Sequence, residues 1–196
     1  MKKFLVALCF GVALSLTAQD YSVPAASPRK KIEQQFSISK VTLDYGRPAV
    51  KGRVVFGDLV PYGKVWRAGA NSSSKITFGQ AVTFGGKDVA AGTYGLYIVP
   101  QANEWKIILN KDSQSWGAFS FDEKLNVVDV TVPVQKLTAK QEWFTMDLKI
   151  VSDNQLSLDI EWDASKVSVP IQVAKADKVT RMIEKINEVK KIEREK

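Results

Sequence analysis

Apolar and polar residues alternate with a period of two through most of this chain, from about residue 36 to residue 173. Such alternation is typical of strands with one buried face, and turn signals such as Gly85-Gly86 separate the runs. The three clearest runs come last and are joined by Ser152-Asp153-Asn154 and Asp163-Ala164-Ser165; they cover residues 144–150, 156–162 and 167–173. They predict an antiparallel meander at the end of the domain.

Further runs rich in β-branched and aromatic residues precede this meander. They cover residues 36–45, 75–78, 81–84, 87–89, 93–99, 104–109, 116–121 and 127–134. In the first run, the apolar residues switch from even positions (Phe36, Ile38) to odd positions (Val41, Leu43, Tyr45) near Ser39-Lys40. This switch predicts a bulge or bend there. With about ten strands and no helix between them, the sequence predicts an all-β fold, either an antiparallel β-sandwich or a flattened barrel. We expect this domain to occupy residues 35–174, after an extended lead-in over residues 19–34.

The period changes after Ala174 and predicts a C-terminal amphipathic α-helix over residues 175–196. Its apolar stripe consists of Val179, Met182, Ile183, Ile186, Val189 and Ile192. We expect the stripe to pack on the domain or to pair with a second copy as a homodimer. Binding to a membrane surface is a weaker interpretation, because Glu184, Glu188, Glu193 and Glu195 dilute the basic face.

The first eighteen residues have the pattern of a secretory signal peptide. Lys2 and Lys3 precede an apolar stretch that is too short to span a bilayer, and Ala18 offers a small residue for cleavage. Lipoprotein processing at Cys9 is disfavoured because the preceding Leu8 is bulky for that signal. We therefore expect a periplasmic or secreted protein with no transmembrane segment in its mature chain.

The composition excludes several kinds of chemistry. The chain contains no histidine, and its single cysteine, Cys9, lies in the predicted leader. Disulfides within the mature chain, Ser-His-Asp triads and the usual zinc sites are therefore excluded. The formal charge of +7 falls to about +5 without the two leader lysines. Export argues against nucleic acid as a partner and favours anionic glycans or acidic lipids. We find no phosphate loop, nucleophile elbow or dinucleotide fingerprint, and we predict no cofactor and no metal.

The segment from Tyr45 to Asn71 combines cations, aromatic residues and glycines in a way that neither a core strand nor an ordinary loop requires. Arginine and lysine suit an anion, and exposed tryptophan or tyrosine suits the apolar face of a sugar ring. The candidate ligand-binding residues are Tyr45, Arg47, Lys51, Arg53, Tyr62, Lys64, Trp66, Arg67, Asn71 and Trp116. They predict a non-catalytic module that binds a glycan or another anionic envelope component or small molecule. The competing interpretation is structural: the cations pair with Asp44, Asp58, Asp112 or Glu104 and pin the loop.

Two other functions stay open at this point. Glu104, Asp112 and Asp122 lie near loop ends, where paired carboxylates would serve a hydrolase acting on polysaccharide or peptidoglycan. Acids at strand ends are also ordinary turn residues. The third function is a structural or assembly factor that associates with itself through the C-terminal helix.

Four stretches carry a resemblance to a known family. They are the run from Tyr45 to Asn71, Ala91-Gly92-Thr93-Tyr94, Trp105 to Lys111, and Trp116-Gly117. Together they resemble the DUF2911 family, an uncharacterised group of secreted proteins common in Bacteroidetes, over roughly residues 25–173. The position of Gly46 is usually serine in that family, so the sequence departs from the pattern there. The resemblance implies an exported β-rich domain and supports the choice of site residues, but it implies no reaction.

Overall fold

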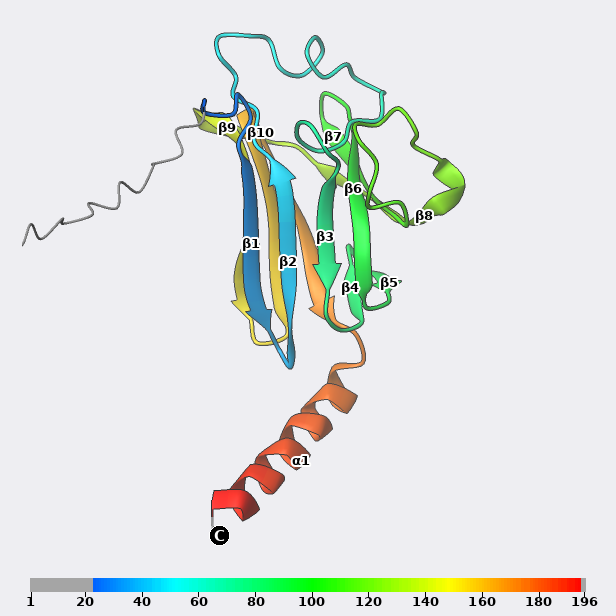
Figure 1. The fold of residues 1–196 in the computed structure, drawn as a ribbon, viewed down its shortest axis with the longest axis vertical. Helices are drawn as coiled ribbons and strands as arrows, with labels where there is room; N and C mark the ends of the chain where they lie inside the picture. The colour runs from blue at the N-terminus through cyan, green and yellow to red at the C-terminus, as the bar shows by residue number, and fades with distance from the viewer. Residues whose placement is uncertain (1–22, 195–196) are drawn as a thin grey trace, which may run out of the picture.

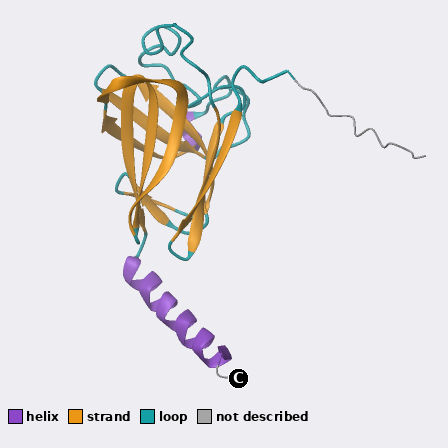
Figure 2. Ribbon diagram, turned by 90° about the vertical axis from the view of Figure 1, so that its left-hand side faces the viewer, coloured by secondary structure: helices purple, strands orange, loops and turns teal. Residues whose placement is uncertain are grey.

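The computed structural model describes residues 23–194, and the predicted signal peptide lies outside these residues. Two antiparallel sheets pack face to face, and one helix extends from the end of the second sheet (Figures 1 and 2). The sheets do not close into a barrel, so the all-β sandwich with a C-terminal helix is confirmed.

The larger sheet has six strands in the order β1-β2-β3-β6-β7-β8, and every neighbouring pair is antiparallel. Alternate side chains of its strands, such as Leu43, Ile76 and Ile107, are completely buried between the sheets. The strands are β1 Arg29–Phe36, β2 Ser39–Gly46, β3 Ser74–Phe78, β6 Gly92–Pro100, β7 Glu104–Asn110 and β8 Asn126–Pro133.

The smaller sheet has the order β5-β4-β10-β9 and covers the inner face of the first. Its strands are β4 Val82–Phe84, β5 Lys87–Val89, β9 Gln135–Ser152 and β10 Gln155–Val173. Both β9 and β10 are long, and β9 pairs with β10 through register shifts that bend the two strands.

Strand β10 reverses direction at Asp163. The Val173 N–H donates to the Asn154 carbonyl at 3.0 Å, and the Ser168 hydroxyl donates to the Asp159 carboxylate at 2.8 Å. Nine residues of a straight strand would separate Asp159 from Ser168 by roughly 30 Å. The two halves of β10 therefore lie side by side, and Asp163 has the positive φ of 50° that the turn requires. The predicted three-strand meander and its second turn are confirmed.

Two local predictions were wrong. The run over residues 36–45 does not contain a bulge: Phe36 ends β1 and Ser39 begins β2, so the parity changes because the chain makes a tight turn. Residues 29–34 of the expected extended lead-in belong to β1, which pairs with β2. Residues 116–121 form turns rather than a strand, and they lead into a short 3₁₀-helix, η1 Glu123–Leu125. β7 pairs with β8.

Helix α1 spans Ala176–Arg194 and begins directly after a turn at Lys175, whose φ is 54°. None of its residues is buried, although Val179 packs against the core. Between residues 23 and 194 the structure contains no helix with the length and apolar character needed to cross a membrane.

Tyr45 and Arg47 join the two sheets along one seam. Tyr45 is fully buried at the end of β2, and its hydroxyl donates to the Met146 carbonyl at 2.8 Å and accepts from the Met146 N–H at 3.0 Å. The Arg47 Nε donates to the Phe144 carbonyl at 3.2 Å. Both side chains thus form hydrogen bonds with backbone groups of β9. Burial raises the pKa of Tyr45.

We predict that Tyr45→Phe lowers the free energy of unfolding by about 1–3 kcal/mol, because two buried backbone groups of Met146 lose their partner. Urea denaturation measures this change. Tyr62→Phe is the matched control, since Tyr62 is exposed. Equal effects of the two substitutions would contradict the role of the seam.

Asp159 forms a buried charged network on the outer side of β10. Its carboxylate accepts from Lys149 at 2.8 Å, Lys166 at 2.7 Å, Ser157 at 2.7 Å and Ser168 at 2.8 Å. Burial by itself would raise the pKa of Asp159, but these four hydrogen bonds outweigh it and hold the pKa well below its ordinary value. The network also ties the two halves of β10 together.

The network predicts a loss of stability in acid. Because the folded-state pKa of Asp159 is depressed, its contribution is complete above the unfolded pKa of about 3.9 and is lost as the pH falls toward the folded value. We predict that Asp159→Asn lowers the free energy of unfolding by about 3 kcal/mol at neutral pH, since it leaves two lysines without their carboxylate.

Denaturation curves of both proteins from neutral pH down to strong acid measure this effect. The difference between them should shrink below about pH 4. Asp88→Asn on β5 is the control, because Asp88 is exposed. A difference that stays constant with pH would contradict the assignment.

Candidate functional site

The connection between β2 and β3, residues 47–73, lies across one end of the sandwich, opposite the end from which α1 leaves (Figures 1 and 2). A pocket of about 350 Å³ opens within this connection. It is lined by Ser27, Pro48, Arg53, Leu59, Val60, Trp66, Arg67, Gly69, Ala70, Asn71 and Trp162. Among the described residues, the lining contains two arginines and no carboxylate, so this part of the pocket is cationic.

A cluster of aromatic rings supports the base of the pocket. Trp66 stacks on Trp162 with centroids 5.6 Å apart and planes at 18°. Phe144 meets both indoles edge to face, and Phe56 packs against Trp66, Trp162 and the buried Trp105. Large rings packed in this way hold an irregular loop firmly, because each buries a large apolar area. The packing of Trp66 thereby holds the next residue, Arg67, at a fixed position.

The backbone that carries Arg67 is held in a strained and crowded path. Ala68 is fully buried with a φ of 49°, a conformation that is unfavourable for a residue with a Cβ. Its carbonyl accepts from the Ser74 hydroxyl at 2.6 Å, and the Trp66 indole donates to the Gly69 carbonyl at 3.0 Å. A Cβ at Gly46 would collide with the Ala70 carbonyl oxygen, which gives a physical reason for glycine at this position.

Arg67 is half-buried and lacks a polar partner. Throughout residues 23–194, no side chain or carbonyl forms an ion pair or hydrogen bond with its guanidinium, and its Nε is a buried donor without an acceptor. Burial lowers the pKa of Arg67, because the charged form loses hydration. An arginine held in this way has donors available for an anion.

An exposed aromatic platform lies beside Arg67. Trp116 and Phe119 are 64% and 86% exposed, and their rings stack with centroids 6.2 Å apart and planes at 15°. The Arg67 guanidinium carbon lies 6.0 Å from the centre of the Trp116 ring. Arg67 thus contacts the platform while it lines the pocket, and it connects the two into one surface.

Backbone hydrogen bonds fix the platform loop to the pocket loop. The Ser73 N–H donates to the Ser115 carbonyl at 3.0 Å, and the Gly117 N–H donates to the Asn71 carbonyl at 3.2 Å. The Ser73 hydroxyl donates to the Gly117 carbonyl at 2.8 Å. Gly117 has a φ of 79°, and an added Cβ would lie only 2.8 Å from the Phe119 ring. Glycine therefore permits the stacked platform.

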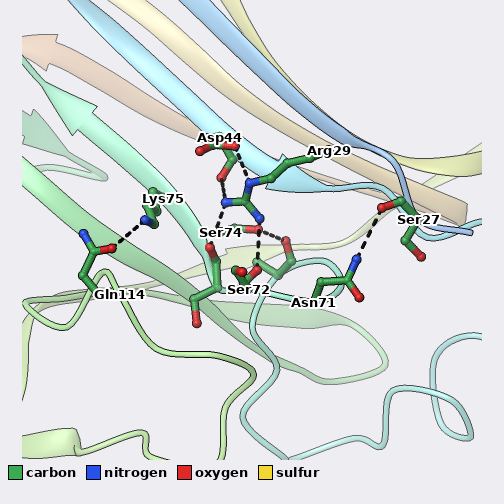
Figure 3. A network of polar contacts seen from close by, with 10 residues as sticks. Ser27, Arg29, Asp44, Asn71, Ser72, Ser74, Lys75 and Gln114 are labelled. Atoms are coloured by element: carbon green, nitrogen blue, oxygen red, sulfur yellow. Dashed lines mark hydrogen bonds and ion pairs between the residues drawn. The ribbon is translucent and has the colours of Figure 1, made fainter. Parts of the chain in front are cut away.

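A second arginine braces the same loops from β1 (Figure 3). Arg29 Nε donates to the Asp44 carboxylate at 2.6 Å, and its terminal nitrogens donate to the carbonyls of Asp44, Ser72 and Ser73 at 3.1 to 3.2 Å. The Asn71 amide donates to the Ser27 carbonyl at 3.5 Å. Arg29 therefore pairs with a carboxylate and pins the loop. This is the structural role that the competing interpretation gave to the cations of the loop itself.

The structure distributes the ten candidate residues among several places. Arg53, Trp66, Arg67 and Asn71 line the pocket, and Trp116 adjoins it through Arg67. Tyr45 and Arg47 belong to the seam between the sheets. The other three, Lys51, Tyr62 and Lys64, are exposed on the same loop but do not line the pocket.

The cations of this loop are not paired with carboxylates. Among the described residues, none of Arg47, Arg53 and Arg67 forms an ion pair. Arg53 donates to the backbone carbonyls of Val50 and Ala49 at 3.0 and 2.5 Å. Arg53 is thus partly used by its own loop, whereas the Arg67 guanidinium donates no hydrogen bond to any described residue.

Two of the three acids considered for hydrolysis, Asp112 and Asp122, occupy structural positions. Asp112 accepts from Gln114, from the Ser115 backbone and from the Ser115 hydroxyl, which lowers the pKa of Asp112. Asp122 caps η1 through the Lys124 N–H at 2.9 Å. Glu104 is exposed on β7. The described part of the chain contains no group of three or more acids that could hold a metal ion.

A larger hollow of about 440 Å³ lies at the opposite end of the sandwich. It is bordered by the β1–β2 turn, the β9–β10 turn and Ile183 of α1, and Asp153 is its single ionisable lining residue. It lacks the combination of unpaired cation and exposed aromatic rings, so we place the candidate site at Arg67.

Phe119 is the part of the platform that the sequence did not reveal. Under the predicted strand over residues 116–121, Trp116 and Phe119 would point to opposite faces, because their separation is odd. The Gly117 turn puts them on the same side. A glycine between two aromatic residues in a polar segment is the signal that could have indicated the turn.

The fold and the site together define a two-sheet antiparallel β-sandwich with a loop-built cationic pocket and an aromatic platform. A family model described as "Protein of unknown function (DUF2911)" matches residues 27–171. The chain therefore belongs to the DUF2911 family, as the resemblance indicated. No curated protein and no solved structure matches it.

Two arginines allow a direct test of which guanidinium is structural. Arg29 makes four hydrogen bonds within the fold, whereas Arg67 makes none to the described residues. We predict that Arg29→Met lowers the free energy of unfolding by about 1–3 kcal/mol. Arg67→Met should leave it unchanged or raise it by up to about 1 kcal/mol, because a buried charge without a partner is removed. Thermal or urea denaturation provides both values, and a larger loss for Arg67→Met would refute this distinction.

Proposed function

We propose that this protein is an exported, non-catalytic module that binds an anionic glycan of the cell envelope through the pocket and platform around Arg67. The observation that carries the proposal is the half-buried Arg67 guanidinium, which has no acceptor among the described residues and lies against an exposed aromatic ring. Export rests on the signal-peptide pattern of residues 1–18.

The charges around the pocket favour an anionic ligand. Its lining, as far as the structure describes the chain, includes Arg53 and Arg67 but no aspartate or glutamate. A guanidinium presents planar paired donors that match a carboxylate, phosphate or sulfate. An anion placed there would accept a hydrogen bond from the buried Nε of Arg67, which has no acceptor among the described residues. This additional hydrogen bond would favour binding of the anion.

The platform favours a sugar ring as the carrier of that anion. Trp116 and Phe119 expose their rings to solvent although both are large and apolar. Sugar rings have apolar C–H faces that pack on such aromatic surfaces. A sugar acid can therefore place its ring on the platform and its charged group against Arg67. A simple inorganic anion would use only the second of these contacts.

A glycosidase is the competing proposal, and it receives no support at this pocket. Hydrolysis of a glycosidic bond generally requires two carboxyl groups about 5 to 10 Å apart across the bond. None of the residues between 23 and 194 that line the pocket carries a carboxyl group. Asp112 and Asp122 are occupied by turn and helix-cap hydrogen bonds.

We predict that isothermal titration detects binding of a galacturonate trisaccharide and much weaker binding of its methyl ester, which has the same rings without the charge. Arg67→Lys should weaken binding of the acid roughly 10- to 100-fold, because the planar fork is lost while the charge remains. Trp116→Ala should weaken binding of the acid up to about tenfold.

Arg181→Lys on α1 is the control, since this exposed arginine does not line the pocket. Equal affinity for the acid and its ester would contradict the role of Arg67. Unchanged affinity in Arg67→Lys would contradict the site itself. A sulfated and a phosphorylated trisaccharide, tested in parallel, identify which anionic group is preferred.

A further inference from the structure

The exposed apolar face of α1 is a second candidate binding surface of this molecule. Met182, Ile186 and Val189 are 50%, 43% and 54% exposed, and none of the residues of α1 is buried. Only Val179 packs against the core of the sandwich, and Ile183 borders the hollow at its end. Beyond its first turns the apolar stripe therefore has no cover within the described residues.

The charged residues of α1 are sorted around this stripe. Successive residues turn by about 100°, so positions three and four apart share a face. Lys178 and Lys185 border one edge of the stripe, and Lys190 and Arg194 border the other. Asp177, Glu184 and Glu188 lie on the opposite side of the helix, together with Arg181 and Lys191. Three of the four acids of α1 therefore lie away from the basic edges, and Glu193 lies within the stripe near the C-terminal end.

From this arrangement we propose that α1 lies in the surface of an anionic lipid membrane and tethers the sandwich to it. Its apolar stripe enters the boundary between headgroups and acyl chains. The lysines and arginine at the edges of the stripe reach lipid phosphates, and the opposite side, which carries charges of both signs, faces water. An amphipathic helix of low overall hydrophobicity with basic edges binds membranes in this way.

A second copy of the chain fits this surface less well. If two stripes face each other, the residues that border them meet across the interface. In parallel pairing Lys185 meets Lys190, and in antiparallel pairing Lys178 meets Lys185. Like charges meet in both orientations and oppose association, whereas the same lysines are attracted to anionic lipid.

The geometry of the molecule is compatible with this tether. Helix α1 leaves the sandwich at the end opposite the residues 47–73 connection (Figures 1 and 2). A membrane at α1 would therefore leave the pocket and the platform accessible. The proposal does not depend on what the pocket binds.

Vesicle flotation of the full protein, recovered after export and checked at its N-terminus by mass spectrometry, tests the proposal. The vesicles contain phosphatidylethanolamine with phosphatidylglycerol, or phosphatidylcholine alone. We expect the protein to float with the anionic vesicles, to bind phosphatidylcholine at least about tenfold more weakly, and to be released by high salt.

A double variant, Met182→Glu with Ile186→Glu, should reduce vesicle binding at least about tenfold, because it puts charge into the stripe. The control is Thr180→Glu with Asn187→Glu, which makes the same charge change outside the stripe and should bind nearly as the natural chain does. Circular dichroism verifies that both variants keep the sheet signal.

Three outcomes would overturn the proposal. The first is no binding to anionic vesicles. The second is an equal loss in both variants. The third is a dimer in light scattering, without vesicles, that only the Met182→Glu, Ile186→Glu variant abolishes, since the stripe would then be covered by a second copy.

Discussion

The hydrogen bonds between the buried Tyr45 hydroxyl and the Met146 backbone join the two sheets, and the functional end of this molecule depends on them. They give both backbone groups of Met146 a partner and fix the point at which the chain leaves β2. From there the chain crosses the end of the sandwich as an irregular connection. Such a connection can hold strained residues such as Ala68 only when its surroundings over-determine its path. The aromatic cluster under Trp66 and the hydrogen bonds of Arg29 provide that restraint.

This rigidity explains how an unpaired arginine persists at the pocket. A flexible loop would let Arg67 move to solvent or to a neighbouring carbonyl, because an unsatisfied buried donor is costly. The packing of Trp66 and the crowded backbone near Gly46 hold Arg67 in place. The same packing positions Trp116 next to it through the contacts between the two loops. Stability elsewhere in the sandwich, including the Asp159 network, allows this end to retain an uncompensated charge.

The sequence predicted the fold well because alternation of apolar residues directly reflects a half-buried sheet. The terminal meander is the clearest case, since the turn at Asp163 was visible between two alternating runs. The functional end was harder to predict. The same side chain has three different roles that only the fold reveals. Arg29 braces the loop, Arg47 joins the sheets, and Arg67 donates no hydrogen bond to any residue that the structure describes. Phe119 was hidden because a glycine turn, and not strand parity, sets its direction.

The most direct measurement is an NMR titration that follows the arginine Nε–H signals as the galacturonate trisaccharide is added. The account predicts that the Arg67 signal shifts with saturation and exchanges more slowly with water, because its buried Nε gains an acceptor. The Arg29 signal should stay in place, since its Nε already donates to Asp44. An Arg67 signal that does not move at ligand saturation would contradict the account.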